Sequence, residues 1–427
     1  MKNTLSNEQK SGILLLLSSK AFERLAFYLI MAILVQYMTD SLELDEDKAG
    51  IYYAVFYGVI GFTSLFSGLL GDLRDRTKIV KIGFILLTVM YLVFAFLPNV
   101  NIVTVISIIL LGLGVGLISP NITVFLGNIY NEKENEVIGL PGFIFLSITI
   151  NIGAFIAPLL SVFLKDNFGY NSIFLVAFVF ALVSLILFLK FKTQYNKLNL
   201  IAEEKTNLGS VTTKKLNTLI LVSVLFIAVL IRFALNQKGL TFTFAIKDYL
   251  DNGVDLNQTL NNIEAYVSIS FLLLFSVLVI RMKRLNWGKI FNLIMIGFVF
   301  SIIAFVLIAS FTSLSQIVDG ESLFVQSYIY LIIAETLIAP AIMYSIYRSS
   351  PVKYKGLFQG VSFFVMGITN SLLFLGALLY EKNNSLAFSL IAIMLSVGVV
   401  LIMALKRSVN QKMITVEENG INVDNKS

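Results

Sequence analysis

The stretch Ser19–Tyr28, SKAFERLAFY, places three ionisable side chains inside a long apolar run at about 12–38. Lys20 and Glu23 are three residues apart and Lys20 and Arg24 are four apart, so all three are neighbours on a helix surface. Charged side chains at membrane depth are costly and by default face a protein interior or a wet cavity. The stretch therefore predicts a functional site on the first membrane helix. An internal salt bridge that only fixes helix packing remains the alternative.

The composition is that of a membrane protein. The chain has 427 residues, of which 57% are hydrophobic and 14% charged, whereas soluble domains contain about 45–50% apolar residues. The chain has neither cysteine nor histidine, which excludes disulfides and thiolate metal sites. We expect no metal and no cofactor, and any proton coupling must use carboxylates. The net charge of +6 is spread over short loops, so it does not indicate nucleic-acid binding.

Twelve apolar segments are long enough to cross a bilayer of about 30 Å. They lie at roughly 12–38, 49–72, 79–97, 102–128, 138–164, 171–191, 216–247, 261–281, 288–313, 323–347, 354–380 and 385–406. The loops between them alternate between basic and acidic, and the positive-inside rule places the basic loops and both termini in the cytoplasm. We therefore expect a multi-pass protein of the inner (plasma) membrane. The first apolar run is too long for a cleaved signal peptide.

The longest polar segment between spans divides the chain into two sets of six helices. The sequence predicts an N-terminal six-helix bundle at 1–192, a cytoplasmic linker at 193–214, a C-terminal six-helix bundle at 215–408 and a polar, disordered tail at 409–427. Ser119-Pro120 and Ala339-Pro340 occupy matching places in the two halves. A parallel six-helix repeat is the layout of major facilitator transporters. We expect an all-α polytopic protein with the major facilitator fold, 12 transmembrane helices in two six-helix bundles.

The loop after the second span reads GDLRDRTK over Gly71–Lys78. It resembles the G-x-L-x-D-R-x-x-[KR] signature of the major facilitator superfamily. In that signature the glycine allows close helix contact, and the Asp–Arg pair can link helix ends across the cytoplasmic face. The resemblance implies a gate formed by Gly71, Asp75 and Arg76. The alternative is an ordinary basic loop that only sets topology.

A lone carboxylate, Glu335, lies near the middle of the tenth span. A charged carboxylate at that depth is expensive unless a cation pairs with it. Glu335 is therefore the best candidate for a proton carrier or for holding a substrate ammonium. Pro340 follows and frees backbone carbonyls in the same region. The alternative is a glutamic acid that is permanently neutral and hydrogen-bonded.

Polar groups of two other spans complete the candidate site. The seventh span carries Arg232, Asn236, Gln237 and Lys238, with Gly239 permitting a bend, and the fifth carries Asn151. An asparagine amide donates and accepts at once, which suits an amide or ammonium ligand. Asparagine also bonds between membrane helices simply to pack them, and both interpretations stay open.

Several of these stretches resemble motifs of the proton-dependent oligopeptide transporters. Phe22–Tyr28 is similar to the family's first-helix E-x-x-E-R-F-x-Y-Y motif. Its signatures in spans 4, 5, 7 and 10 resemble, in order, Ser119–Ile122, Ile150–Pro158, Asn236–Gly239 and Ala334–Pro340. In that family the span-1 Arg and span-4 Lys meet the peptide carboxylate, while the span-10 Glu and span-5 Asn meet its amino end. The resemblance implies that Arg24, Glu335 and Asn151 contact substrate and that Tyr28 lines the site.

Four positions depart from the family pattern. Lys20 replaces the first glutamate of the first-helix motif, Ser119 the span-4 lysine, Asn236 the span-7 glutamate and Met31 a second arginine of many members. We include Lys20 and Asn236 among the substrate-binding candidates. The charges expected at membrane depth show a surplus of cations, which favours an anionic group on the substrate. They are Lys20, Arg24, Arg232 and Lys238 against Glu23 and Glu335.

These observations predict a secondary active transporter. The sequence shows no nucleophile–base pair, metal-ligand cluster or nucleotide loop, so we do not expect an enzyme. The expected function is proton-coupled uptake of di- or tripeptides, or of a related small zwitterionic or anionic solute, by alternating access. Glu23 and Glu335 are the proton-coupling candidates, and the proton gradient is the driving force. The alternative is an exporter of a small anionic metabolite or siderophore-like compound. A channel is disfavoured because closely spaced charges would obstruct an open pore.

Overall fold

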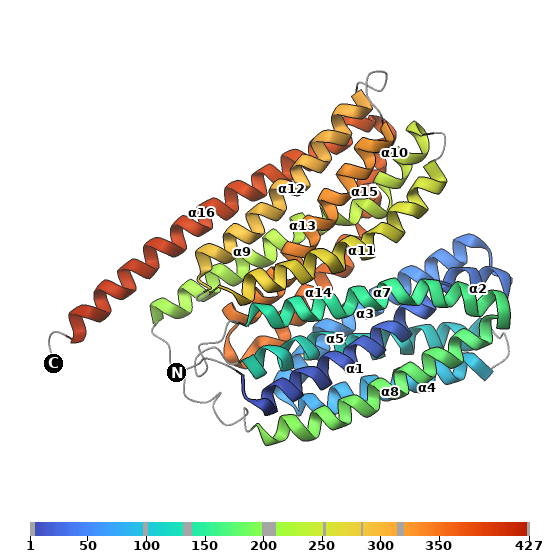
Figure 1. Ribbon diagram of the computed structural model, residues 1–427, viewed down its shortest axis with the longest axis horizontal. Helices are drawn as coiled ribbons and strands as arrows, with labels where there is room; N and C mark the ends of the chain where they lie inside the picture. Colours follow the sequence, from blue (N-terminus) through green and yellow to red (C-terminus); the bar gives the residue numbers. More distant parts are fainter. Residues whose placement is uncertain are drawn as a thin grey trace. The chain divides into compact units, whose positions relative to one another are not determined.

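The computed structural model describes residues 5–96, 101–130, 139–198, 211–250, 253–282, 285–313 and 320–424. Within these ranges the chain is helical and contains no β-strand, which confirms the predicted all-α class. The chain divides into two compact units, and Figure 1 shows long helices as the elements of each. Unit 1 comprises Met1–Lys205 and Val352–Ile368, and unit 2 comprises Thr206–Pro351 and Thr369–Ser427. The segment Val352–Ile368, predicted in the C-terminal bundle, thus groups with unit 1.

Unit 1 packs α1 against α7 and α8, and α5 against α3 and α4. Its described helices are α1 (Asn7–Met31), α2 (Leu34–Asp40), α3 (Glu46–Leu73), α4 (Arg76–Phe96), α5 (Asn101–Tyr130), α7 (Leu140–Phe168) and α8 (Tyr170–Lys197), with η3 (Val352–Tyr354) and most of α14 (Lys355–Ser371). Aromatic rings fill its core, for example Phe84 against Phe188, with centroids 5.2 Å apart. The predicted first span is therefore two helices, because the chain breaks between α1 and α2.

A local cap and close contacts to α7 hold α1 in place. Its N-terminus has a capping box in which the Ser6 hydroxyl accepts the Gln9 amide and the Gln9 side chain accepts the Ser6 amide. Further along, the Ser161 hydroxyl of α7 donates to the Leu29 carbonyl over 2.9 Å. A Cβ on Gly153 of α7 would collide with Arg24, so this glycine permits the close approach of α7 to the charged stretch. The charges of α1 therefore sit at a tightly packed helix contact.

Unit 2 contains helices that are interrupted within predicted spans. Its described helices are α9 (Val211–Asn236), η2 (Gln237–Gly239), α10 (Thr241–Tyr249), α11 (Gly253–Ile280), α12 (Trp287–Ser313), α13 (Gly320–Ser349), the end of α14, α15 (Leu373–Lys382) and α16 (Asn384–Asp424). The predicted seventh span is broken by the 3₁₀ turn η2, and the eleventh is broken between α14 and α15. The turn η2 falls on the polar stretch Asn236–Gly239, where Gly239 was expected to permit a bend, whereas the break between α14 and α15 was not predicted.

The C-terminal tail differs from its prediction. We expected residues 409–427 to be disordered, but α16 continues as far as Asp424. The polar segment contains no proline, and a helix propagates more easily than it starts, so α16 extends beyond its apolar part. The predicted linker at 193–214 is helical at both ends, in α8 and α9, and its residues 199–210 lie outside the described part.

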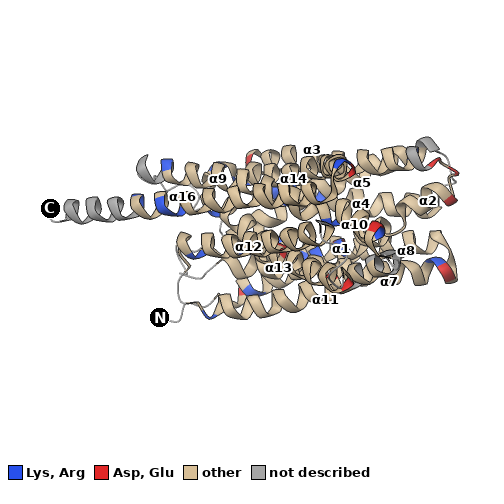
Figure 2. Cartoon of the chain, turned by 90° about the horizontal axis from the view of Figure 1, so that it is seen from above, with Lys and Arg blue, Asp and Glu red and all other residues tan. Residues whose placement is uncertain are grey.

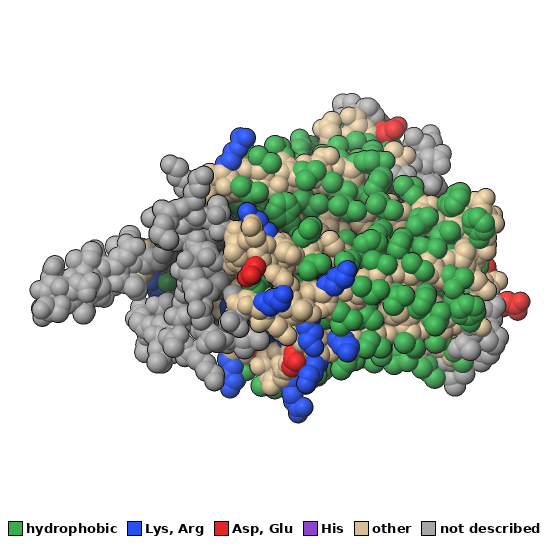
Figure 3. Space-filling model, turned by 60° about the horizontal axis from the view of Figure 1, so that its bottom comes forward, with side chains coloured by type: hydrophobic (Ala, Val, Ile, Leu, Met, Phe, Trp, Pro, Cys, Tyr) green, Lys and Arg blue, Asp and Glu red, His purple; other side chains and the backbone are tan. Residues whose placement is uncertain are grey.

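Eleven helices of the described residues are long and apolar enough to cross a membrane. We predicted twelve, and the missing one is α1, whose 25 residues include three buried charges. At 1.5 Å per residue α1 is about 37 Å long, which is enough to span. The space-filling view in Figure 3 shows apolar side chains over much of the face in view. Figure 2 shows that charged residues are sparse along the helices. The chain is therefore a multi-pass membrane protein.

Candidate functional site

The charges of α1 form a compact ionic cluster in unit 1. We call Lys20, Glu23 and Arg24 the α1 cluster. The Lys20 Nζ lies 2.8 Å from Glu23 Oε2, and Arg24 Nε donates to the same oxygen over 2.7 Å while its Nη2 contacts Oε1. The side chains of Lys20, Glu23 and Arg24 are 4%, 0% and 11% exposed. One carboxylate is thus sealed between two bases.

Groups around the α1 cluster come from α1 itself and from α5. Lys20 Nζ donates to the Ser119 hydroxyl over 3.3 Å. Ser119 stands where the family pattern has a lysine, and here the ammonium beside this position comes from Lys20 of α1. The Arg24 guanidinium lies 4.3 Å from the centre of the Phe27 ring and 5.9 Å from that of Tyr28. Both distances are in the range of cation–π attraction. The structure therefore brings Lys20, Glu23, Arg24 and Tyr28 together.

Asn151 makes a hydrogen bond within its own helix. Its Nδ2 donates to the Ser147 carbonyl of α7 over 2.9 Å. The side chain is half-buried, and Gly153, two residues later, packs on Arg24. Asn151 thus lies on α7, which adjoins the α1 cluster. Its amide forms a hydrogen bond within α7 and not with the cluster.

A second ionic cluster lies in unit 2 around Lys238 of η2. Its Nζ lies 2.8 Å from Glu264 Oε1 of α11 and 2.8 Å from Glu335 Oε2 of α13. The Tyr328 hydroxyl donates to Glu264 Oε2 over 2.6 Å, and its ring centre lies 5.6 Å from the Lys238 ammonium. We call Lys238, Glu264, Tyr328 and Glu335 the Lys238 cluster. It joins three elements that are far apart in the sequence.

The other predicted residues of the seventh span contribute in different ways. Arg232 lies near enough to Glu335 for electrostatic attraction. Asn236 Nδ2 donates to Asn370 Oδ1 over 2.5 Å and lies 3.4 Å from the Thr369 hydroxyl. Asn236 therefore links α9 to α14 within unit 2, as expected of an asparagine that packs membrane helices.

Glu264 and Tyr328 were not predicted from the sequence. Glu264 lies four residues into the predicted eighth span, where a charge resembles the end of a loop. It is the acidic residue of the apolar helix segment Ile263–Ile280, and an acidic residue inside an apolar segment could have been recognised in the sequence. Tyr328 had no signal, because a tyrosine near a span end is ordinary. Glu335 is accordingly not a lone carboxylate.

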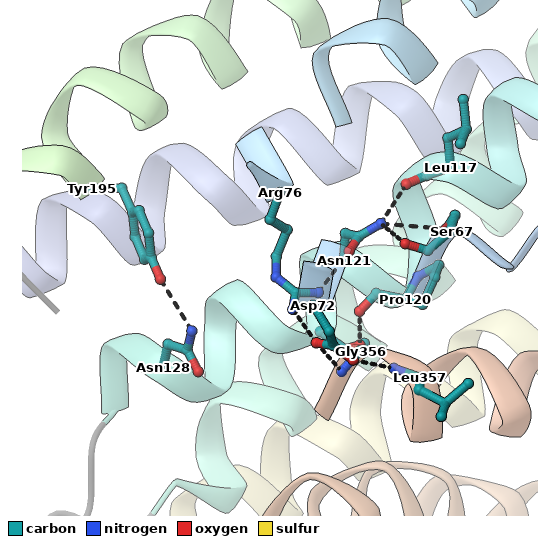
Figure 4. A network of polar contacts seen from close by, with 11 residues as sticks. Ser67, Asp72, Arg76, Leu117, Pro120, Asn121, Asn128, Tyr195, Gly356 and Leu357 are labelled. Atoms are coloured by element: carbon teal, nitrogen blue, oxygen red, sulfur yellow. Dashed lines mark hydrogen bonds and ion pairs between the residues drawn. The ribbon is translucent and has the colours of Figure 1, made fainter. Parts of the chain in front are cut away.

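The end of α3 and the start of α4 form a polar network in unit 1 (Figure 4). Arg76 pairs with Asp72 over 2.5 Å and donates to Asn121 Oδ1 of α5 over 2.6 Å. The Asp72 carboxylate accepts the backbone amides of Gly356 and Leu357 over 2.8 and 2.7 Å. These amides belong to the first turn of α14, where a carboxylate is favoured by the unpaired N–H groups and the helix dipole.

The predicted pair of Asp75 with Arg76 does not form. Asp75 instead caps α4, where it accepts the amide and hydroxyl of Thr77 over 3.0 and 2.7 Å. Partial burial raises the pKa of Asp75, but the hydrogen bonds from Thr77 outweigh this and leave the pKa below its ordinary value. Asp72 takes the place of Asp75 because it lies one helical turn before Arg76. A Cβ on Gly71 would collide with the side-chain ends of Asn121 and Arg76, so glycine at this position leaves room for their hydrogen bond.

The sequence matches the family model of the Major Facilitator Superfamily over residues 16–380. Dipeptide and tripeptide permease A of Proteus mirabilis (strain HI4320) is 26% identical over 194 residues, which are 43% of this chain and 39% of the permease. The uncharacterized transporter YclF of Bacillus subtilis (strain 168) is 27% identical over 183 residues, which are 42% of this chain and 37% of that protein. These matches thus span well under half the length of the relatives.

Solved structures with the same fold cover nearly the whole chain. A POT family transporter in complex with 5-aminolevulinic acid is 16% identical with a TM-score of 0.67, covering 93% of this chain and 96% of that one. The human organic anion transporter MFSD10 is 13% identical with a TM-score of 0.70, covering 93% of this chain and 100% of that one. At these identities the likeness shows the fold alone. The match of the family model over residues 16–380, together with this fold, means that the chain belongs to the major facilitator superfamily.

Proposed function

We propose that this protein is a proton-coupled secondary transporter, and not an enzyme, that takes up a small carboxylate-bearing solute by alternating access. The solute class comprises di- and tripeptides and related small zwitterionic or anionic compounds, which agrees with the dipeptide and tripeptide permeases among its relatives. The observation that carries the proposal is an ionic cluster within the apolar helices of each unit. Intramembrane charges of this kind mark substrate and ion pathways. We place the protein in the inner (plasma) membrane with both termini cytoplasmic.

The α1 cluster is the proposed anion site. Two bases and one acid leave it with one net positive charge in a nearly sealed environment. A buried charge without a partner is costly, so a solute carboxylate would be favoured there. Arg24 already binds both oxygens of Glu23 through Nε and Nη2, so a solute carboxylate would compete with Glu23 for the planar guanidinium. Lys20 and Tyr28 lie beside it and would complete the contacts.

The Lys238 cluster is the proposed proton-coupling site. The Glu335 side chain is 36% exposed, whereas that of Glu23 is fully sealed between two bases. Protonation of Glu335 would remove its ion pair with Lys238 and loosen η2 from α13. The ion pair of Lys238 with Glu264 would remain. This supports Glu335 as the principal proton carrier, with Glu23 as the second candidate.

The Asp72 network is the proposed gate. Asp72 joins the end of α3 to the first turn of α14, and Arg76 and Asn121 fix its carboxylate. Such a contact holds two helix ends together in one state and must open in another. The gate therefore consists of Gly71, Asp72 and Arg76, and the role of Asp75 is to start α4.

Uptake into proteoliposomes tests the proposal directly. The full chain is reconstituted, and a labelled dipeptide, a labelled tripeptide and an N-acetylated dipeptide are supplied with and without an inward proton gradient. We expect gradient-stimulated accumulation of at least one of them, abolished by a protonophore. Absence of uptake of all three by folded, monodisperse protein would contradict the proposed solute class.

An exporter of a small anionic metabolite or siderophore-like compound is the second candidate. The surplus positive charge of the α1 cluster favours it, because that surplus suits an anion in either direction of transport. Flux measured in right-side-out and inside-out vesicles separates the two. If an inward proton gradient drives the solute out of right-side-out vesicles, the protein is an exporter and the uptake proposal is wrong.

A further inference from the structure

The Lys238 ammonium lies between two carboxylates whose side chains are more exposed than its own. The side chain of Lys238 is only 10% exposed, whereas those of Glu264 and Glu335 are 33% and 36% exposed. Both carboxylates contact the ammonium at the same distance of 2.8 Å. The lysine is therefore the most buried member of the cluster, and its ammonium lies between the two acids.

The partners of Lys238 are those that recognise a primary ammonium. An ammonium has three N–H donors and no acceptor. Here Glu264 and Glu335 each accept from it, and the ring of Tyr328 offers its face at 5.6 Å. The Tyr328 hydroxyl orients Glu264 from the far side. A free amino group of a solute would need this same set of partners.

The charges of this region are already balanced. Lys238 and Arg232 contribute two positive charges, and Glu264 and Glu335 contribute two negative charges, so the sum is zero. The α1 cluster, in contrast, keeps one positive charge that Glu23 does not neutralise. An incoming carboxylate thus finds a surplus cation, while an incoming ammonium finds its carboxylates filled.

We propose that Lys238 is a built-in ammonium that fills the Glu264–Glu335 site, so that the solute of this protein is a carboxylate without a free amino group. The proposal rests on the proposed function and narrows its substrate class. A group tethered to the chain competes at an effective concentration of about millimolar or more, so a dilute solute amine does not displace it. Lys238 is thereby a specificity-determining residue, which selects against zwitterionic peptides.

Three matched ligands test the substrate class on the wild-type chain in lipid nanodiscs. They are Ala-Ala, N-acetyl-Ala-Ala, which lacks the ammonium, and Ala-Ala amide, which lacks the carboxylate. We expect N-acetyl-Ala-Ala to bind about tenfold more tightly than Ala-Ala, since one charge-assisted contact is worth roughly this factor. Ala-Ala amide should bind least. Equal or tighter binding of Ala-Ala by the wild type would overturn the proposal.

The lysine itself is tested with Lys238→Ala and a small amine as its replacement. Propylammonium chloride should raise the melting temperature of Lys238→Ala in a saturable manner, because it refills the site between the two carboxylates. It should not do so for the wild type or for Lys238→Arg, in which the site is filled. The double variant Lys238→Ala/Glu335→Gln should also lose the effect. Absence of stabilisation in folded Lys238→Ala would overturn the assignment of an ammonium site.

The two measurements separate this inference from the proposed function. Lys238→Ala should also reverse the ligand preference, so that Ala-Ala gains about tenfold over its wild-type affinity. If propylammonium stabilises Lys238→Ala but no peptide derivative binds the wild type, Lys238 fills an ammonium site and the peptide-like solute class is wrong. If peptide derivatives bind and N-acetylation makes no difference, the transporter assignment stands and the role of Lys238 is refuted.

Discussion

The two ionic clusters have opposite compositions. In the α1 cluster one carboxylate lies between two bases, whereas in the Lys238 cluster one ammonium lies between two carboxylates. The first is built within a single helix and is nearly sealed, while the second joins η2, α11 and α13 and has acids that are about one-third exposed. A cluster within one helix can hold a charge but does not depend on where other helices lie. A cluster across three elements changes whenever one of them moves or takes up a proton.

The largest expected effect comes from breaking the exposed cluster at Glu335. We expect Glu335→Gln to abolish gradient-driven accumulation but to keep solute exchange, because the variant can no longer gain or lose the proton. Uptake and counterflow in proteoliposomes measure the two activities separately. Concentrative uptake by Glu335→Gln would remove Glu335 from the coupling role. Glu264→Gln is the matched control, in which Glu335 and its proton remain.

The free energy of unfolding should depend more on the α1 cluster than on the Lys238 cluster. Glu23→Gln leaves Lys20 and Arg24 as two buried cations without a carboxylate, and we expect a loss of about 3–5 kcal/mol in the free energy of unfolding. Glu264→Gln should cost much less, because solvent reaches its site. Thermal unfolding of both variants in the same lipid nanodiscs measures the difference. Equal losses would show that the α1 cluster is not the sealed member of the pair.

The gate offers a comparison between two neighbouring aspartates. Asp72→Asn removes the charged acceptor of two amides of α14 and of Arg76, and we expect a loss of about 1–3 kcal/mol in stability with altered transport. Asp75→Asn should change little, because asparagine caps helices as well as aspartate does. Melting curves and initial uptake rates for the two variants provide the measurement. A larger effect at Asp75 would restore the gate that the signature implied.

Asp75 also predicts a small pH effect. Its pKa in the folded chain lies below the ordinary value, so its cap stabilises α4 fully above the unfolded pKa and this contribution disappears as the pH falls through the lowered pKa. Asp75→Asn should therefore lose this part of the acid dependence of melting. Melting temperatures of the wild type and Asp75→Asn across the acid range give the comparison. Parallel curves would contradict it.

The smallest expected effect is at Asn236. Its amide bonds Asn370 and Thr369, so Asn236→Ala should weaken helix packing by about 0.6 kcal/mol, the average for such bonds in membranes. Solute affinity should stay the same, because the side chain is committed to α14. Binding of N-acetyl-Ala-Ala to this variant provides the test. A tenfold loss of affinity would instead identify Asn236 as a substrate contact.

Local relations could be predicted from the sequence, while long-range ones could not. The pairing of Lys20 with Glu23 follows from a spacing of three residues on a helix. The need of Glu335 for a cation was also evident, but its partner Lys238 is 97 residues away, and no spacing rule reaches that far. Glu264 was missed for a different reason, because it lies near the start of its predicted span, where a charge resembles the end of a loop. The helical class and most spans follow from hydrophobic runs, which record the environment of each segment by itself.

The gate motif did not indicate which aspartate Arg76 contacts. The signature around Gly71 fits Asp75 by its letters, yet helix geometry selects Asp72, which lies one turn before Arg76. The turn η2 coincides with the polar stretch Asn236–Gly239, where the sequence indicated a bend. The break between α1 and α2 was missed, because it depends on backbone conformation, which hydrophobicity alone does not record.

The 3₁₀ turn η2 gives the seventh span an adjustable winding. A 3₁₀ helix turns about 120° per residue and an α-helix about 100°. Rewinding the three residues Gln237–Gly239 as α-helix would therefore rotate α10 relative to α9 by about 60° around the helix axis. A Cβ on Gly239 would meet no atom within 4 Å, so the space beside this glycine is open. A change in helical pitch over three residues would then swing an ammonium away from its acids without unfolding either helix.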